Sequence, residues 1–223
     1  KLITLNATTG STPQRVFASN TNTLILMSNN ELYCTGVARY GACGFRESED
    51  IEFPNAYVKV NTTNLQGRKI KSIGMCNLQS HIVTEDGLLF SFGYFSNNKS
   101  ITYIPTQIFN FAARIRDISC GFYHCLLIDE NRRMLVFGTN EGGQLGLRHD
   151  RYVPNYEQVS VGGGVSQVAA CEKGSMLLTD DNRIYSWGST LGGDGSSYIT
   201  NSPRYEARLP FREGFKKIIC CFR

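Results

Sequence analysis

The stretch 137–147, FGTNEGGQLGL, places three glycines within five positions, a composition that can wrap a loop around a phosphate. A phosphate-binding loop of the G-x-x-x-x-G-K-[ST] type needs a lysine and a hydroxyl after its last glycine, whereas Gly146 is followed by leucine and arginine. The dinucleotide-binding spacing G-x-G-x-x-G is not met by Gly142, Gly143 and Gly146 either. We therefore predict no cofactor at this loop.

The histidines and paired carboxylates are the remaining candidates for chemistry. His81 falls on an apolar strand-like run and His149 in a loop, and neither spacing is that of a metal site. His124 is interpreted as a hydrogen-bonded structural residue in preference to a functional one. The carboxylate pairs at 49–50 and 180–181 fall in turns, where Asp and Glu are common. We predict no catalytic residue and no metal.

Composition and charge restrict the class of protein. With 223 residues and 41% hydrophobic content the chain can bury a core. The net charge of +4 is spread over scattered basic residues, which favours an ordinary solvated surface over nucleic-acid binding. No apolar run approaches the roughly 18 residues that cross a bilayer, so we predict no membrane insertion.

Four fifteen-residue stretches align without a gap and share one physical plan. An apolar run comes first, a polar tetrapeptide of Asn, Asp, Glu and Gly type follows, and a second run with an aromatic residue ends in glycine. Two short apolar segments around such a turn are typical of a β-hairpin. The stretches are NTLILMSNNELYCTG (22–36), QSHIVTEDGLLFSFG (79–93), HCLLIDENRRMLVFG (124–138) and GSMLLTDDNRIYSWG (174–188).

The glycines that close these stretches recur with a period of about fifty residues. After each comes a loop with a proline and a further strand-like run, and another such run precedes each hairpin. Four short strands per unit at this period predict an all-β fold, a β-propeller of four-stranded blades with about four blades present. The structural repeat glycines are Gly36, Gly93, Gly138 and Gly188, where positive φ or close strand approach favours glycine.

Five of the eight cysteines follow the same repeat. Cys120 and Cys220 share one repeat position, and Cys76, Cys171 and Cys221 share the next, where other repeats carry Ala, Gly or Met. Residues that interchange in this way behave as small packing groups. We predict buried, reduced thiols in preference to disulfides or metal ligands, which implies a reducing compartment and an intracellular protein.

These repeats resemble those of the regulator of chromosome condensation family. VFGTNEGGQLGL matches that repeat most closely, YSWGSTLGGDG and LYCTGVARYGACGF are further copies, and ISCGFYHCLLIDENRRMLVFG carries its Cys-Gly-x-x-His motif. The resemblance runs from about residue 14 to the end of the sequence. It implies a ring of seven blades, of which this chain would hold part.

The expected domain organisation follows from the resemblance. We expect one β-propeller domain or partial propeller over 1–223, and because the sequence starts with lysine we expect it to be an excerpt or a processed form. Further chain or a partner would then cover the exposed sheet edges. The expected repeats are approximately 14–68, 69–113, 114–163 and 164–213, with 214–223 beginning a further blade.

The resemblance also implies candidate functions. The founding member of this family resembles a guanine-nucleotide exchange factor for a small GTPase. This exchange factor also contacts chromatin. In the exchange factor an acidic residue follows soon after a Gly-x-Phe sequence, and here residues 96–98, Ser-Asn-Asn, stand in that place. The exchange factor also inserts a hairpin as a wedge, for which the segment 146–154 is too short. We therefore predict a non-enzymatic protein-protein interaction module, on its own or as a subunit of a larger assembly, with a small GTPase or a larger complex as partner. Nucleotide exchange is the alternative, and chromatin or RNA binding the second alternative.

One exposed segment has the composition of a binding site. Arginine and tyrosine are enriched among binding hot spots, and propeller loops are common binding elements. An ordinary solvated loop is the competing interpretation. The candidate partner-binding residues are Arg148, His149, Asp150, Arg151 and Tyr152.

Overall fold

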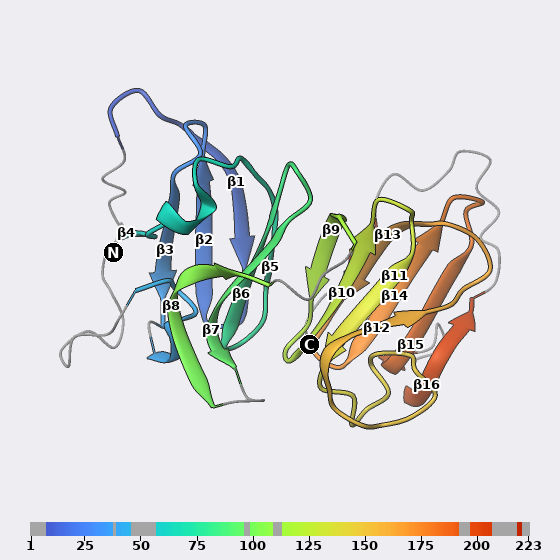
Figure 1. Ribbon diagram of the computed structural model, residues 1–223. Helices are drawn as coiled ribbons and strands as arrows, with labels where there is room; N and C mark the ends of the chain where they lie inside the picture. The colour runs from blue at the N-terminus through green and yellow to red at the C-terminus, as the bar shows by residue number, and fades with distance from the viewer. Residues whose placement is uncertain are drawn as a thin grey trace. The chain divides into compact units, whose positions relative to one another are not determined.

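The computed structural model describes residues 8–37, 39–45, 57–95, 99–108, 113–191, 197–206 and 218–219. The chain forms two compact units, Lys1–Phe111 (unit 1) and Ala112–Arg223 (unit 2). Each unit contains two four-stranded antiparallel sheets with sequential strand order (Figure 1). The all-β prediction with four-stranded blades is therefore confirmed.

Among the described residues of unit 1, eight strands form the two sheets. Two 3-10 turns, η1 (Arg39–Gly41) and η2 (Thr63–Leu65), lie in the connections between its described strands. The strands are β1 (Pro13–Ala18), β2 (Asn22–Met27), β3 (Leu32–Gly36), β4 (Val58–Lys59), β5 (Ile70–Met75), β6 (Gln79–Thr84), β7 (Leu89–Phe95) and β8 (Ser100–Gln107).

Unit 2 repeats the same plan, and its inner hairpins begin at the residues that the sequence alignment indicates. The expected further strand near the C-terminus falls outside the described residues, apart from 218 and 219. The strands are β9 (Ile115–Cys120), β10 (His124–Asp129), β11 (Met134–Gly138), β12 (Val153–Val159), β13 (Val165–Ala170), β14 (Gly174–Thr179), β15 (Ile184–Leu191) and β16 (Ser197–Tyr205).

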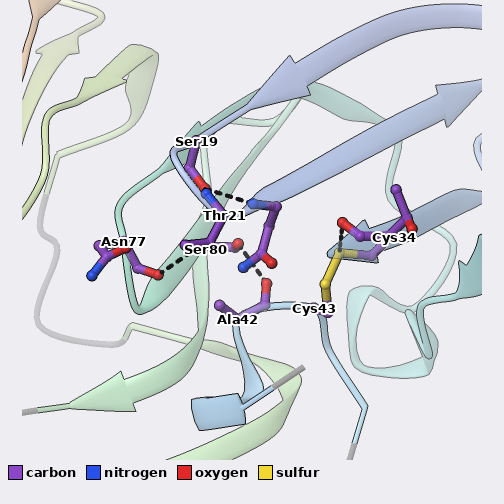
Figure 2. Close-up of a disulfide and its surroundings, with 9 residues drawn as sticks. Ser19, Thr21, Cys34, Ala42, Cys43, Asn77 and Ser80 are labelled. Atoms are coloured by element: carbon purple, nitrogen blue, oxygen red, sulfur yellow. Dashed lines mark hydrogen bonds between the residues drawn. A yellow bond between two sulfur atoms is a disulfide. The ribbon is translucent and has the colours of Figure 1, made fainter. Parts of the chain in front are cut away.

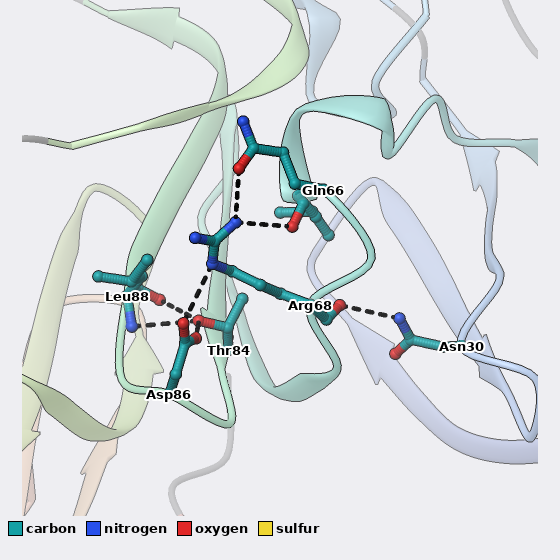
Figure 3. A network of polar contacts seen from close by, with 7 residues as sticks. Asn30, Gln66, Arg68, Thr84, Asp86 and Leu88 are labelled. Atoms are coloured by element: carbon teal, nitrogen blue, oxygen red, sulfur yellow. Dashed lines mark hydrogen bonds and ion pairs between the residues drawn. The ribbon is translucent and has the colours of Figure 1, made fainter.

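The turn of each inner hairpin contains a residue of positive φ at the same repeat position. A three-residue hairpin loop requires such a residue. In the β6–β7 turn, the Thr84 hydroxyl donates to Asp86 at 2.5 Å and accepts from the backbone N–H of Leu88 at 3.1 Å (Figure 3). Arg68 pairs with the same Asp86 carboxylate at 3.0 Å. The positive-φ residues are Asn30, Gly87, Arg132 and Asn182.

The glycines that close the hairpins have no room for a side chain. Their φ values lie between 81° and 120°. A Cβ on any of them would lie 2.2 to 2.4 Å from the carbonyl oxygen of the residue just before the partner strand. Glycine recurs there because both the backbone conformation and the close approach require it. These residues are Gly36, Gly93, Gly138 and Gly188.

Within each unit the two sheets share one apolar core. The unit 1 core joins residues from both sheets, including Leu24 and Phe92, each fully buried. The unit 2 core does the same and contains the fully buried Trp187. At about 25 cal/mol per Å² of buried apolar surface, these shared cores are the main stabilising term.

The prediction of reduced thiols is wrong for several cysteines. Cys34 is bonded to Cys43 (Figure 2), Cys120 is bonded to Cys125, and Cys171 is also disulfide-bonded. Comparing repeat with repeat could not reveal that Cys120 faces Cys125 across two neighbouring strands, with Cα atoms 4.1 Å apart. The inference of a reducing compartment rested on those thiols and loses its basis.

The first disulfide occupies two repeat positions that hold buried apolar residues in unit 2. Counted from the closing glycine of each repeat, Cys34 corresponds to Val136 and Cys43 to Leu145. Val136 and Leu145 are both fully buried in the core of unit 2. The cysteines are therefore core residues, as the repeat pattern indicates, but they are joined covalently.

We predict that Gly138→Ala destabilises unit 2 by about 3 kcal/mol or more, since it combines an unfavourable φ with steric overlap. Gly67→Ala is the matched control, because Gly67 has φ of +77° but nothing within 4 Å of the added Cβ; it should cost about 1 kcal/mol. Urea unfolding measures both. Equal losses for the two variants would show that close approach does not constrain the closing glycine.

Candidate functional site

The loop between β11 and β12 is organised by one buried amide. The Asn140 side chain accepts from the backbone N–H of Leu145 at 2.8 Å and donates to the carbonyl of His149 at 2.6 Å. Asn140 is completely buried. These two hydrogen bonds connect the glycine-rich stretch to the segment that follows. They therefore fix the backbone from which the predicted binding residues project.

A second set of bonds fastens this loop to the neighbouring sheet of unit 2. The carbonyl of Gln144 accepts from the Ser175 hydroxyl at 2.7 Å and from the Trp187 indole N–H at 2.8 Å. Because the single hydroxyl proton of Ser175 is used on Gln144, the His124 ring N–H donates to Ser175, at 2.9 Å. This network joins residues of the sheet β9–β12 to strands β14 and β15.

Unit 1 contains an equivalent hydrogen bond from a serine of one sheet to a loop carbonyl. We call this serine–carbonyl bond the clamp in both units. The Ser80 hydroxyl donates to the carbonyl of Ala42 at 2.7 Å (Figure 2). Counted from their closing glycines, Ala42 and Gln144 occupy one repeat position, and Ser80 and Ser175 another. The glycine-rich loop therefore acts as a connection between sheets in both units.

The structure separates the predicted binding residues into two kinds. His149 is an anchor, because its carbonyl is held by Asn140 and its Nδ1 accepts from the backbone N–H of Arg151 at 3.2 Å. Its Nε2 lies 3.8 Å from the Glu157 carboxylate. The exposed members are Arg148, Asp150, Arg151 and Tyr152.

Arg148 is fixed by its backbone. Its φ is 62°, and its N–H donates to the carbonyl of Asn201 in β16 at 2.7 Å. A non-glycine residue with positive φ is uncommon and directs its side chain differently from a residue in a strand. The Arg148 guanidinium is thus presented at the surface by a backbone bonded to another strand.

An exposed aromatic residue that the sequence did not single out lies at the same end of the sheet. Tyr123, 46% exposed, lies in the turn between β9 and β10, and its carbonyl accepts from the N–H of Thr139 at 2.8 Å. Its ring meets that of Phe122 edge to face, with centroids 4.6 Å apart. The available signal was the topology, since this turn and the 139–152 loop lie at one end of a β-meander. We call Tyr123, Arg148, Asp150, Arg151 and Tyr152 the interaction edge of unit 2.

The two strand histidines are buried structural residues. Burial lowers the pKa of His124 to about 4 and that of His81 to about 4. His81 Nδ1 lies 2.6 Å from the Ser91 hydroxyl. Both rings are therefore neutral at physiological pH, in agreement with the structural interpretation of His124.

The sequence model of the regulator of chromosome condensation (RCC1) repeat matches residues 115–144, the span that contains the buried His124 and the start of the clamped loop. Residues 115–144 are thus an RCC1 repeat, and the resemblance that the sequence indicates is confirmed over this span.

Two curated relatives extend the match over most of the chain. The X-linked retinitis pigmentosa GTPase regulator homolog of Caenorhabditis elegans is 25% identical over 189 residues, 80% of this chain and 13% of that protein. The serine/threonine-protein kinase Nek9 of Mus musculus is 27% identical over 216 residues, 86% of this chain and 21% of that protein. This RCC1-repeat chain spans less than a quarter of the length of either relative.

Two solved structures share the fold. Human WBSCR16 aligns with a TM-score of 0.75 and 18% identity, over 87% of this chain and 52% of that one. Yeast RCC1 (Prp20), solved bound to Kap60, aligns with a TM-score of 0.71 and 19% identity, over 94% and 52%. The four sheets thus match part of an RCC1 propeller. No helix among the described residues has the length and apolar character needed to span a bilayer.

The buried histidines predict a specific pH dependence. The unfolded chain takes up protons near pH 6.5, whereas the folded rings do so only near pH 4, so stability falls as the pH falls through this window. From about pH 7 to about pH 5 each histidine should lower the free energy of unfolding by about 2 kcal/mol. Urea unfolding at the two values measures this change.

The chain itself suggests the control variants. Position 81 corresponds to Met176 and position 124 to Gln79 in other repeats, so His81→Met and His124→Gln are substitutions that the fold carries elsewhere. The double variant should lose about 4 kcal/mol of the acid-induced decrease. An unchanged decrease would mean that the rings are protonated in the folded protein.

Proposed function

We propose that this chain is a non-enzymatic protein-interaction module of a larger assembly and that it binds its partner through the interaction edge of unit 2. The observation that carries the proposal is the fixed presentation of exposed arginine and tyrosine side chains. Asn140 and Asn201 hold the backbone of the edge by bonds of 2.6 and 2.7 Å. A site held in place before binding loses less conformational entropy on association.

The chemistry of the edge favours a protein partner. Tyr123 and Tyr152 are each 46% exposed, and tyrosine and arginine are the residue types that dominate protein hot spots. Arg148 and Arg151 alternate with Asp150, so the edge is of mixed charge. A nucleic-acid site would instead concentrate positive charge along one surface.

Site-specific photo-crosslinking tests this function directly. A benzophenone amino acid placed at position 152 of the full-length protein in its native cells should crosslink a discrete partner. The same group at Asn131, which is exposed in the turn at the opposite end of the sheet, should not. Crosslinked proteins are identified by mass spectrometry.

Affinity then confirms the assignment. Arg148→Ala/Arg151→Ala/Tyr152→Ala should weaken binding of the identified partner by at least about thirtyfold, as expected when hot-spot residues are removed. Asn131→Ala should leave it unchanged. The proposal fails when position 152 gives no more crosslinking than position 131, or when the triple variant binds normally.

Nucleotide exchange on a small GTPase is the second candidate. It is favoured by the similarity to the Caenorhabditis elegans relative, a GTPase regulator homolog, and by the fold shared with yeast RCC1. Against it, the structure has no strand within 139–152, where the family resemblance implies a wedge hairpin. The residues 96–98 that replace the family's acidic residue lie outside the described residues. Accelerated release of labelled nucleotide at substoichiometric protein would establish exchange and overturn the non-enzymatic proposal.

A further inference from the structure

Three tyrosines of unit 1 gather around one glycine. The rings of Tyr40, in η1, and Tyr94, in β7, lie with centroids 5.7 Å apart and planes tilted by 58°. A Cβ on Gly41 would lie 3.2 Å from Cδ1 of Tyr103, in β8, and 3.0 Å from Cγ2 of Ile101. Tyr40 and Ile101 are exposed and the other two rings are half-buried. We call Tyr40, Tyr94 and Tyr103 the tyrosine patch.

Unit 2 shows that the fold does not need these aromatic rings. Counted from the closing glycines, Tyr40 corresponds to Gly142 and Tyr94 to Ser189; aligned on the prolines of β8 and β16, Tyr103 corresponds to Asn201. Gly143, the counterpart of Gly41, packs against Thr200 and Asn201 in the same way. The same loop therefore docks on the same strand with small or polar residues at all three positions.

The patch is also maintained at a conformational cost. Tyr40 has φ of 72°, a region that is unfavourable for a bulky side chain. Residues held in such conformations cluster at binding and switch sites. An aromatic residue that is strained, exposed and absent from the equivalent repeat is better explained by recognition than by packing.

The chemistry of the patch indicates the kind of partner. Tilted tyrosine rings offer apolar faces on which the proline rings of a polyproline II segment can pack. The patch residues are uncharged, and the exposed Lys99 precedes β8 directly, which suits acidic residues at the ends of the bound segment. Sites for single-stranded nucleic acid combine aromatic rings with a positively charged groove. The three tyrosines of the patch carry no charge, which favours a protein segment over nucleic acid.

We propose that the tyrosine patch binds a proline-rich, acid-flanked segment of a partner protein in the polyproline II conformation. This site belongs to unit 1 alone and is independent of the interaction edge of unit 2. The two proposals can therefore fail separately.

The test uses the whole protein and a synthetic peptide of five prolines with two glutamates at each end. Calorimetric titration should show binding to the native protein, and Tyr40→Gly/Tyr94→Ser/Tyr103→Asn should weaken it at least about tenfold. Arg148→Ala/Arg151→Ala/Tyr152→Ala, in the other unit, should bind the peptide normally. A peptide with glycines in place of the prolines should bind at least about tenfold more weakly than the proline peptide.

Tyr40→Gly alone separates recognition from folding. Relief of the positive φ should raise the melting temperature by about 2–4 °C, while peptide binding weakens. The proposal is overturned when the native protein does not bind the proline peptide, when the glycine peptide binds equally well, or when the triple tyrosine variant binds as the native protein does. Binding of an oligothymidylate in place of the peptide would assign the patch to nucleic acid and overturn it as well.

Discussion

A serine hydroxyl bound to a loop carbonyl connects one sheet to the next in each unit. Ser80 binds the carbonyl of Ala42, and Ser175 binds that of Gln144, both at 2.7 Å. The chain leaves the inner hairpin through a glycine of positive φ, and the loop that follows brings its carbonyl to the serine of the neighbouring sheet. Close contacts also require glycine within the loop, because a Cβ on Gly143 would lie 2.7 Å from the carbonyl oxygen of Thr200 and one on Gly146 2.9 Å from the Trp187 indole nitrogen.

The clamp also determines where variation is tolerated. Two core positions, one in the last strand of the inner hairpin and one in the loop, hold Val136 and Leu145 in unit 2 and the disulfide-bonded Cys34 and Cys43 in unit 1. Residues that face solvent are free to differ, and the two units carry different residue types there. Unit 2 presents charged residues and tyrosines after its loop, and unit 1 presents the tyrosine patch beside it. A fixed scaffold with variable loop surfaces is the usual basis of binding in repeat folds.

Much of the fold could be predicted from periodicity alone. The inner hairpins begin at Asn22, Gln79, His124 and Gly174, as the alignment of the fifteen-residue stretches indicates, because alternating burial and turn chemistry are local properties of the sequence. The cysteine pairing could not be predicted in this way. Cys120 and Cys125 face each other across neighbouring strands, and a comparison of repeats does not show cross-strand partners.

The candidate site was predictable only in part. The composition of residues 148–152 marked them as a binding segment, but the sequence could not show that His149 is an anchor. The predicted hairpins did place Tyr123 at the same end of the sheet, but they gave no sign that its ring is exposed. Tyr40 was missed for a similar reason. Its positive φ and its contact with Tyr94 depend on how η1 packs on β7, which is a tertiary property.

Hydrogen exchange in a Ser175→Ala variant tests the clamp most directly, with Ser166→Ala as its control. Ser166 also donates to a carbonyl, that of Leu178 at 3.0 Å, but the bond stays within one sheet. We predict that Ser175→Ala lowers the free energy of unfolding by about 1–2 kcal/mol and speeds the exchange of the amides of Gly143, Leu145 and Gly146. Ser166→Ala should leave the exchange of these amides unchanged. Unchanged protection of the loop amides in Ser175→Ala would contradict the role of the serine in connecting the sheets.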